Sequence, residues 1–459
     1  MVGRVEFPLV YELQTNSYKL IMLQHQDPEV YGIIEKEKVR QKEGLEMIPS
    51  ENYASVAVLE AMGSILNDKY AEGYPGKRYY GGNIHIDEIE RLTQKRACEV
   101  FGAVDYHVNV QPYSGSPANI EVYLGLLELG EKIMGLKLAH GGHLTHGDPV
   151  SLSGRAFKFV HYEVDAESEV LDYAKIAALA KKEKPKILLS GFTAYPRLID
   201  FRKMHDIAQE VGAVSMADIS HISGLIIGGM HPSPFPFTDV VTTTTHKTLR
   251  GPRAAMIFCK EEYKEKIDKA VFPGMQGGPH EHTIAAVAVA LREAQQPEFK
   301  KYAAQIVKNA KALAQTLLDE KLKLVSGGTD NHLLLIDLRP FGPGRGIFLE
   351  KALEAAGITV NKNPIPNDSS PPYYPSGIRL GTPALTSRGM KEAEMQKIGK
   401  WIAKLAQEFA KTEMPEEKEK RATTVKDFTK SLPAHPLVKE VGEEVRAFAA
   451  KFPVPGIDK

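Results

Sequence analysis

Cysteine and tryptophan are scarce in this chain of 459 residues, and neither sign of charge dominates. The two cysteines, Cys98 and Cys259, cannot form a disulfide framework and have no metal-ligand spacing, so we expect a reducing compartment. Lys+Arg and Asp+Glu both number 58, which leaves no net charge to attract nucleic acid or an anionic membrane. The longest apolar run, residues 284–291, is far too short to span a bilayer. With no recognisable secretory signal, these absences predict a soluble cytoplasmic protein without membrane or nucleic-acid partners.

The remaining composition is that of an ordinary globular protein, 43% hydrophobic and 25% charged, long enough for two or three domains. Residues 1–68 are interpreted as an N-terminal arm with helices over 28–43 and 55–66. From about residue 85 helical and strand patterns alternate, which predicts a mainly parallel sheet with helices on both faces. The expected helices here are 87–101, 116–129 and 201–211, and the expected strands are 106–110, 186–192, 213–218 and 239–245.

After about residue 295 the pattern changes to that of a smaller α+β domain. Its expected helices are 298–322, 346–356, 387–412 and 437–452, and its expected strands are 332–338 and 377–381. The mixed-sign run EEKEKR at 416–421 is interpreted as a solvated connection. We therefore expect an arm (1–68), a large α/β domain (69–295) and a small C-terminal α+β domain (296–459).

The most informative stretch is TTTTHKTL at residues 242–249. Its β-branched residues predict a buried strand, which ends at His246 and Lys247. A lysine at the mouth of a strand can be partly desolvated, which lowers its pKa and frees the amine to attack a carbonyl, as a Schiff-base enzyme requires. Most lysines are solvated surface charges, however, so this interpretation depends on the other motifs.

Three other motifs point to one cofactor. In SGS at 114–116, between a strand and a helix, small residues let backbone N–H groups approach a phosphate, although an ordinary N-cap would look the same. Asp218 ends the strand before the lysine strand and can keep a pyridinium nitrogen protonated. Arg379, flanked by glycines, can bind a substrate carboxylate through two hydrogen bonds or form a structural salt bridge. A lysine, an anion and a phosphate cradle together indicate pyridoxal 5'-phosphate (PLP).

Two loops admit more than one interpretation. The histidines of HGGHLTHG at 140–147 are spaced somewhat like metal ligands, but no cysteine or carboxylate completes a zinc set. Its glycines favour a tight loop that places an imidazole on the cofactor ring, so we expect no metal. The loop KYAEGYPGKRYYGG at 69–82 could stack on nucleic-acid bases, but Glu72 and the tyrosine hydroxyls also suit proton transfer in a partly buried site.

From about residue 43 to 389 the sequence closely resembles serine hydroxymethyltransferases, PLP enzymes of the aspartate-aminotransferase-like fold (fold type I). The segments that carry the resemblance are PSENY at 49–53, the loop at 70–82, QPYSGS at 111–116, the loop at 140–147, residues 242–253, FPGMQGGP at 272–279 and residues 376–383. The resemblance implies a large domain with a mainly parallel seven-stranded sheet and a smaller C-terminal α+β domain. It also implies reversible transfer of the serine hydroxymethyl carbon to the co-substrate tetrahydrofolate, giving glycine and 5,10-methylenetetrahydrofolate through a PLP Schiff base.

The resemblance further implies roles for individual residues. Those implied at the cofactor are Lys247 as the Schiff-base lysine, Asp218 at the pyridinium nitrogen, His143 on the ring, Ser114, Gly115 and Ser116 at the phosphate, His221 and Thr193 near the phenolic oxygen, and His246, Tyr70, Gly277 and Gly278. Those implied at the substrates are Arg379, Ser50, Tyr80 and Arg253 for the amino acid, Glu72 near its hydroxyl, and Leu138, Gly142, Leu144 and Asn363 for the folate. Those implied in catalysis are Lys247, Glu72, Tyr80, His246, Asp218 and Thr244.

The resemblance implies that the active unit is at least a homodimer, with a tetramer as the larger alternative. Residues 70–80 and the glycines at 277–278 would reach the site across the dimer interface. Three segments depart from the family pattern. Around Gly-Pro-Arg, Arg250 stands where a small residue is common and Ala254-Ala255 where glycines are common. Ile219-Ser220 stands where Met-Ala is common, and Thr193 where Ser is usual. None of these changes removes a catalytic group.

Two other functions fit part of the pattern. A threonine or allothreonine aldolase on the same fold would use the same retro-aldol chemistry without folate. A non-catalytic scaffold could keep the fold and lose the reaction. The folate-loop match and Glu72 favour the transferase over the aldolase, and the intact Lys247, Asp218 and Arg379 argue against a scaffold.

Overall fold

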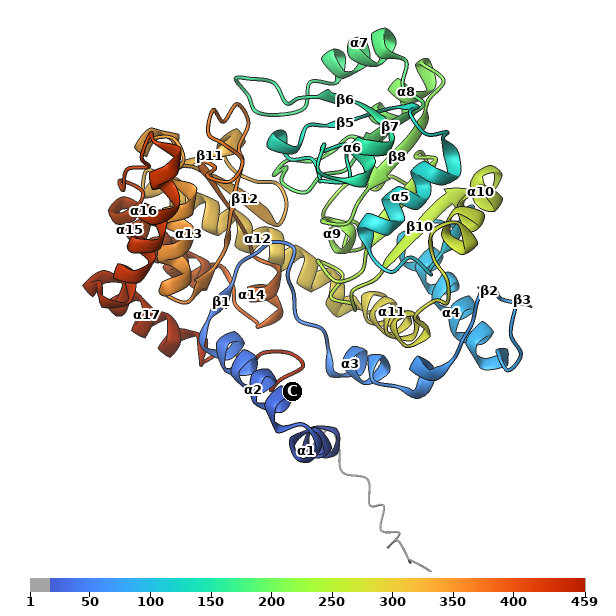
Figure 1. Ribbon diagram of the computed structural model, residues 1–459, viewed down its shortest axis with the longest axis horizontal. Coiled ribbons are helices and arrows are strands. Elements are labelled where there is room, and N and C mark those ends of the chain that lie inside the picture. The colour runs from blue at the N-terminus through green and yellow to red at the C-terminus, as the bar shows by residue number, and fades with distance from the viewer. Residues whose placement is uncertain (1–16, 459) are drawn as a thin grey trace, which may run out of the picture.

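Seven strands form the largest sheet in the computed structural model, which describes residues 17–458 (Figure 1). The strands are β4 (Tyr106–Asn109), β5 (Lys132–Leu136), β6 (Lys158–Tyr162), β7 (Ile187–Ser190), β8 (Val214–Asp218), β9 (Val240–Thr244) and β10 (Ala255–Lys260), in the order β4-β10-β9-β8-β7-β5-β6. Neighbours are parallel except where β10 pairs with β4 and β9. The predicted mainly parallel, seven-stranded sheet is therefore confirmed.

Helices cover both faces of this sheet. They are α4 (Ile84–Phe101), α5 (Gly115–Leu126), α6 (Leu152–Ala156), α7 (Tyr173–Glu183), α8 (Phe201–Glu210), α9 (Ser223–Ile227), α10 (Lys264–Lys269) and α11 (Glu281–Ala294). Successive side chains of a strand point to opposite faces. Met134 of β5 accordingly packs in the core formed with α4, α7, α8, α9 and α11, whereas Ile133 packs in the core formed with α5 and α10. Burial on both faces explains why these strands are continuously apolar.

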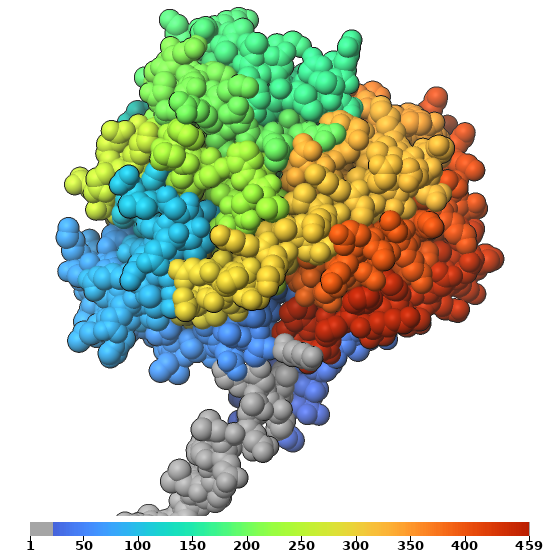
Figure 2. All heavy atoms as spheres, turned by 180° about the vertical axis from the view of Figure 1, so that it is seen from behind, coloured from blue at the N-terminus to red at the C-terminus, as the bar shows by residue number. Residues whose placement is uncertain are grey.

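A second, smaller part of the fold follows the long helix α12 (Pro297–Asp319). Its antiparallel sheet has the order β11-β12-β15-β14, made of β11 (Lys323–Leu324), β12 (Leu333–Asp337), β14 (Asn361–Asn363) and β15 (Gly377–Gly381). Its helices are α13 (Gly346–Ala355), α14 (Pro383–Ser387), α15 (Glu392–Phe409), α16 (Lys418–Ser431) and α17 (Pro436–Ala449). In the reverse view, the yellow surface of α11 and α12 runs between the blue and green surface of the large part and the red surface of the small part (Figure 2).

The N-terminal segment contacts both parts. After α1 (Ser17–Gln26) and α2 (Pro28–Glu43), β1 (Leu45–Glu46) pairs in parallel with β13 (Ile358–Thr359), and Leu45 lies in the core of the small part. In contrast, α3 (Val56–Met62) packs on α11, where Val58 lies in one cluster with Ala286 and Ala290. The turn between β1 and α3 therefore passes between the two parts. Residues 1–16 of the predicted arm lie outside the described residues.

Three predicted helix boundaries are wrong. The run 416–421, expected as a connection, contains the start of α16, which packs through Phe428 on Phe348 at a ring-centroid distance of 5.0 Å. The helix expected over 387–412 corresponds to α15, which begins only at Glu392, because Ser387 ends α14 and Gly389 then adopts a left-handed φ of 88°. The helix expected over 55–66 ends at Met62, and a separate 3-10 turn follows at Ile65–Asp68.

No helix within residues 17–458 has both the length and the apolar character needed to cross a bilayer. The sequence did not predict β5, β6 and β10 of the large sheet or β11 and β14 of the small one. Gly135 weakens the strand pattern of β5, and β11 and β14 are only two and three residues long.

Candidate active site

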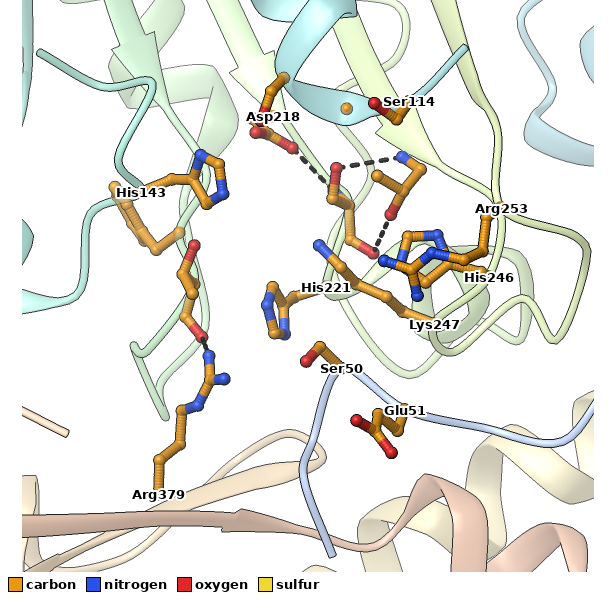
Figure 3. A pocket seen from close by; sticks show the side chains of 16 residues that line it. Ser50, Glu51, Ser114, His143, Asp218, His221, His246, Lys247, Arg253 and Arg379 are labelled. Atoms are coloured by element: carbon orange, nitrogen blue, oxygen red, sulfur yellow. Dashed lines mark hydrogen bonds between the residues drawn. The ribbon is translucent and has the colours of Figure 1, made fainter. Parts of the chain in front are cut away.

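A cavity of about 350 Å³ lies at the carboxyl ends of β7, β8 and β9, between the two parts of the fold (Figure 3). Open α/β sheets bind ligands in this position. The residues that line it are Ser50, Glu51, Ser114, Gly115, Ser116, His143, Phe192, Thr193, Asp218, Ser220, His221, Thr244, His246, Lys247, Arg253 and Arg379. Glu51, Phe192 and Ser220 were not predicted as site residues. All the other lining residues were, and the structure brings them together from segments far apart in the chain.

Lys247 lies just beyond the end of β9 and points its amine into the cavity (Figure 3). Burial lowers the pKa of Lys247 to about 8; the charge of Asp218 opposes this shift, and the charges of Arg379 and Arg253 add to it. A larger share of this amine is therefore unprotonated near neutral pH than in a solvated lysine. The neutral amine is the form that attacks a carbonyl.

The backbone around Lys247 is held in a tight turn. Its carbonyl accepts hydrogen bonds from the side-chain amide of Asn52 (2.9 Å) and from the backbone N–H of Arg250 (3.1 Å). Arg250 has a φ of 62°, which costs a non-glycine residue about 1–2 kcal/mol. Its guanidinium lies 4.1 Å from the centre of the Tyr302 ring, a cation–π contact that offsets part of this cost. The contact with Tyr302 thus helps this turn to accommodate Arg250, where a small residue is common in the family.

Asp218, the last residue of β8, is surrounded by donors. Its Oδ2 accepts hydrogen bonds from Asn119 (2.9 Å) and from His146 Nε2 (3.3 Å), and its Oδ1 accepts one from the backbone N–H of Ser220 (3.0 Å). Burial would raise the pKa of Asp218, but the hydrogen bond and charge of His146 and the charge of Lys247 hold that pKa well below its usual range. Asp218 is therefore an anion at the floor of the cavity.

The N-terminus of α5 provides an anion cradle. Ser114 precedes the helix in an extended conformation, and its hydroxyl makes no capping hydrogen bond. A Cβ on Gly115 would lie 2.6 Å from Cγ2 of Thr244, so only glycine lets this turn approach β9. The free N–H groups of a first helical turn attract a phosphate. The residues here fit a phosphate at one end of the cavity and a protonated ring nitrogen beside Asp218, which are two requirements of PLP.

His143 lies in the wall of the cavity, in the loop after β5. Its Nδ1 accepts the backbone N–H of Thr145 (3.1 Å) and lies 2.8 Å from the Thr145 hydroxyl. Burial lowers the pKa of His143 to about 4, with a further contribution from His146, so the imidazole is neutral. In the described part of the chain no group of three or more His, Cys, Asp or Glu side chains is arranged to hold a metal ion.

Arg379 in β15 reaches the cavity from the small part. Its Nε donates to the side-chain oxygen of Asn361 (3.0 Å) and its Nη1 to the carbonyl of Thr193 (2.9 Å). Burial lowers the pKa of Arg379 to about 10, which still leaves the guanidinium charged at neutral pH. These two bonds fix the plane of the guanidinium at the cavity wall, next to Ser50 and Glu51 of the turn before α3 (Figure 3).

Two further histidines of the cavity are also neutral. His221 Nδ1 lies 3.3 Å from Nε2 of His332, which is completely buried behind it. Burial lowers the pKa of His221 well below its usual value and that of His332 to about 3. Burial likewise lowers the pKa of His246, beside Lys247, to about 3. Neutral imidazoles of this kind can donate or accept single hydrogen bonds without adding positive charge around Lys247.

Five predicted site residues form a second cluster outside this cavity: Tyr70, Glu72, Tyr80, Gly277 and Gly278. The rings of Tyr70 and Tyr80 meet edge-on at 5.4 Å. A Cβ on Gly278 would lie 3.5 Å from the Tyr70 ring, and one on Gly277 would lie 3.5 Å from the Glu72 carboxylate. The side chains of Tyr70 and Tyr80 are 63% and 49% exposed, so this cluster faces outward in the single chain.

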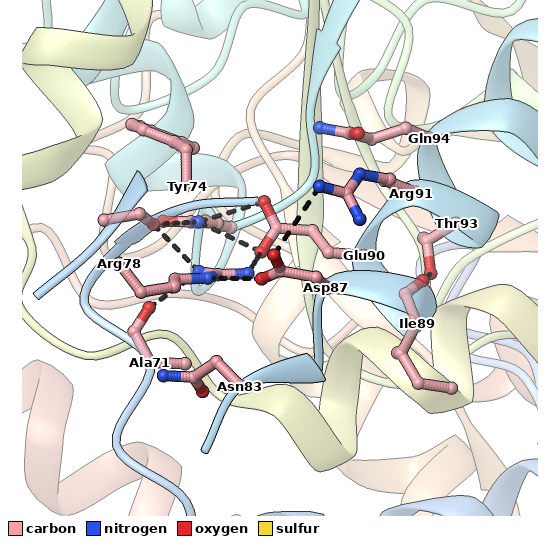
Figure 4. A network of polar contacts seen from close by, with 12 residues as sticks. Ala71, Tyr74, Arg78, Asn83, Asp87, Ile89, Glu90, Arg91, Thr93 and Gln94 are labelled. Atoms are coloured by element: carbon pink, nitrogen blue, oxygen red, sulfur yellow. Dashed lines mark hydrogen bonds and ion pairs between the residues drawn. The ribbon is translucent and has the colours of Figure 1, made fainter. Parts of the chain in front are cut away.

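A buried polar network fixes the loop that carries Glu72 (Figure 4). Arg78, in the hairpin strand β3 (Lys77–Arg78), donates through Nη1 to the carbonyls of Ala71 (2.7 Å) and Gly73 (2.9 Å), which flank Glu72. Its Nη2 donates to Glu90 (2.6 Å) and its Nε to Asp87 (2.9 Å), both on α4. The loop therefore has a defined conformation although its tip is exposed.

The residues expected at the folate lie outside the cavity lining. Leu144 is 46% exposed, next to His143 in the loop after β5. Gly142, in the same loop, cannot carry a side chain, because a Cβ would lie 2.1 Å from the Leu136 carbonyl. Leu138 lies at the start of this loop in a short 3-10 turn, and Asn363 ends β14.

Sequence reasoning missed the supporting residues. Asn119 and Asn361 hold Asp218 and Arg379, and His332 contacts His221. One signal was present: Asn119 is a polar residue within the apolar helix segment ANIEVYL, where a buried amide needs partners. His146 was noted only as a third histidine of its loop.

Comparison with known proteins agrees with this geometry. The family model described as serine hydroxymethyltransferase matches residues 23–402. A serine hydroxymethyltransferase of Desulfotalea psychrophila is 53% identical over 436 residues, which cover 95% of this chain and 96% of the relative. Those of Koribacter versatilis and Acidobacterium capsulatum are 56% and 54% identical over 382 and 383 residues, in each case 83% of this chain and 89% of the relative.

Proposed function

The chain belongs to the serine hydroxymethyltransferase family, and we infer that it is a PLP-dependent transferase that converts serine and tetrahydrofolate reversibly into glycine and 5,10-methylenetetrahydrofolate. One observation carries this proposal: Lys247 with a lowered pKa, anionic Asp218 and charged Arg379 surround a single cavity. The fold-level resemblance alone would not identify the reaction.

The cavity supplies a partner for each part of PLP. The turn Ser114–Ser116 would hold the phosphate at the N-terminus of α5, and Asp218 would pair with the ring nitrogen. His143 would lie against the ring, with His221 and Thr193 near its phenolic oxygen. Bound in this way, PLP supplies an electron-withdrawing ring that stabilises negative charge at the substrate Cα while the Cα–Cβ bond breaks.

The residues of the chain prepare the substrate for this cleavage. Arg379 would bind the carboxylate of the amino acid, assisted by Ser50, and so fix which bonds at Cα face the cofactor. Lys247 would be displaced from the cofactor by the substrate amine and return when the product leaves. The neutral state of His221 and His246 keeps additional positive charge away from the amine.

Glu72 would hold or move the proton of the substrate hydroxyl, and Tyr80 would assist at the carboxylate. Since both belong to the outward-facing cluster, we propose that each cavity receives this cluster from a partner subunit of a homodimer. Exposed apolar side chains around the loop support such an interface, notably Ile65 (84% exposed), Tyr79 (73%) and Ile84 (75%). A cytoplasmic location is part of this proposal, and a tetramer is the larger alternative to the dimer.

The folate would enter along the loop after β5, past Leu138, Gly142 and Leu144, and reach Asn363 of the small part. Its pterin would then lie near the hydroxymethyl group released from serine and capture that carbon at the oxidation level of formaldehyde. An aldolase would need no such contact. The folate response therefore distinguishes the two reactions.

The test is an absorption spectrum of the PLP-loaded protein, recorded alone, with glycine, and with glycine plus tetrahydrofolate. We expect a visible cofactor band that gives way to a red-shifted band only when both additions are present. A cofactor band without a folate response would replace the transferase with the aldolase. Failure to bind PLP at all would refute an enzyme of this class, and the Lys247→Ala variant provides the control for covalent attachment.

A further inference from the structure

Asn119 occupies a central position behind the cavity without lining it. It is 1% exposed on α5, the helix whose N-terminus forms the anion cradle. Its Nδ2 donates to Asp218 Oδ2 (2.9 Å) and to the Thr145 hydroxyl (2.9 Å), and its Oδ1 accepts from the Thr242 hydroxyl (2.8 Å). One side chain therefore links β8, β9 and the loop after β5 to the phosphate helix.

The chemistry of these partners fixes which way the amide points. An ionised carboxylate only accepts hydrogen bonds, so the atom that faces Asp218 must be the NH₂ group and not the carbonyl oxygen. The carbonyl oxygen then faces Thr242, which can donate its single hydroxyl hydrogen to it. With every polar atom paired and completely buried, the amide cannot rotate without leaving a group unsatisfied.

The chain of hydrogen bonds that starts at Asn119 continues through Thr145 to His143. The Thr145 hydroxyl accepts a hydrogen bond from Asn119, and its own hydrogen is free to be donated to His143 Nδ1 at 2.8 Å. The backbone N–H of Thr145 donates to the same nitrogen. His143 Nδ1 is therefore an acceptor, and the proton of the neutral ring lies on Nε2.

We propose that Asn119 is a positioning residue for the cofactor, which holds Asp218 as an anion under the ring nitrogen and at the same time orients the Thr145 hydroxyl that fixes His143. This inference rests on the proposed function, because Asp218 and His143 act on PLP. His146 donates to the same Asp218 oxygen from the other side, at the longer distance of 3.3 Å, so Asn119 is the closer of the two side-chain donors.

The test compares Asn119→Leu, of similar volume but without polar atoms, with Thr242→Val. Both changes remove Thr242's hydrogen bond to Asn119 from the same buried network, but Thr242→Val leaves the two N–H donors of Asn119 in place. We expect the dissociation constant for PLP, measured by titrating the apoprotein, to rise about ten- to a hundredfold in Asn119→Leu, as for the loss of a hydrogen bond to a charged group. It should change by less than about threefold in Thr242→Val, while both apoproteins lose thermal stability.

Two further variants keep the test decisive. Asn119→Ala also removes the donors and adds no atoms to the buried site, so it replaces Asn119→Leu if that variant does not fold, with the same expected loss of affinity. Thr145→Val leaves the bonds to Asp218 intact, and we expect it to retain PLP affinity but to change the visible circular dichroism of the bound cofactor. Equal affinity losses in Asn119→Leu and Thr242→Val would reduce Asn119 to a structural residue and refute the inference. A wild-type protein that does not bind PLP would refute the proposed function instead.

Discussion

Lys247 and Asp218 have lowered pKa values for different physical reasons. Burial disfavours the ammonium form of Lys247, so its pKa falls. Burial disfavours the charged form of Asp218 as well, but donated hydrogen bonds and nearby positive charge outweigh that effect. The result is an amine that loses its proton more readily than a solvated lysine, beside a carboxylate that stays ionised although it is buried. Perturbation of this kind is typical of functional sites.

At this scale, the rate at which the apoprotein combines with PLP should follow the ionisation of Lys247. Below its pKa the amine is protonated and unreactive, so we expect the rate to rise with pH and to level off above about 8. Because Asp218 raises the pKa of Lys247, Asp218→Asn should move this rise to lower pH. Rapid-mixing absorbance at a series of pH values measures it. A rate that keeps rising toward the ordinary lysine pKa of 10.5 would contradict the burial argument.

Asp218→Ala should bind PLP weakly and lose serine cleavage. Without the anion the ring nitrogen is no longer held in its protonated form, and a neutral pyridine withdraws electrons poorly. We expect turnover to fall by about a hundredfold or more, on the scale of removing one preorganised electrostatic group. Steady-state kinetics at saturating PLP measure the effect. Full activity in this variant would refute the assignment of Asp218.

At the scale of elements, the contact between α5 and β9 depends on one missing side chain. Gly115 lets the first turn of the helix approach Thr244, and this places the anion cradle next to the strand that leads to Lys247. The helix begins at Gly115, inside SGS and one residue before the predicted start at residue 116, but only the packing explains why this residue must be glycine.

Gly115→Ala should therefore destabilise the protein by about 1–3 kcal/mol through overpacking. The added methyl would lie 2.6 Å from Thr244 Cγ2, so the double variant Gly115→Ala/Thr244→Ser, which lacks that carbon, should recover part of the loss. Urea unfolding measures both. Gly32→Ala in α2 is the matched control, because a Cβ there meets nothing within 4 Å and should be neutral or stabilising.

Other elements show where local patterns mislead. The charged sequence of α16 resembles a solvated linker, and its helix exists because Phe428 docks between Phe348 and Phe409 of two other helices. The strands β5, β6 and β10 were not predicted, and pairing with neighbouring strands holds each of them in the sheet. Tertiary contacts override weak local preference in such segments. Long periodic helices such as α12 were predicted to within a few residues, because their apolar face repeats over many turns.

At the scale of the whole molecule, the predicted site residues other than the four expected at the folate divide into two sets. One set lines the cavity between the two parts of the fold, and the other faces outward beside exposed tyrosines. Within a single chain, Lys247 therefore lies in the cavity, whereas Glu72 lies in the outward-facing cluster. The division is what a symmetric dimer would require if each subunit completed the cavity of the other.

Mixed dimers test this arrangement. Neither Lys247→Ala nor Glu72→Gln should be active alone, but a dimer that contains one subunit of each has one intact site. Random mixing makes half of the dimers hybrids, so about a quarter of the wild-type activity should return. Activity after joint refolding measures it. The control pairs Lys247→Ala with Asp218→Ala, two lesions of the same cavity, and should recover nothing; recovery there, or none in the first mixture, would contradict the shared site.

The sequence by itself determined the class of fold and the chemical types at the site. The alternation of strand and helix patterns, the lysine after a β-branched strand, and the SGS turn are local features that survive without a structure. Tertiary structure alone decided which groups meet. Asn119 contacts Asp218 across 99 residues of the chain, His332 contacts His221 across 111, and Asn361 contacts Arg379 across 18. The exposed cluster around Glu72 lies outside the cavity that contains Lys247. The reason is physical: hydrogen bonds and burial depend on distances in space, and no local pattern records which distant segments will pack together.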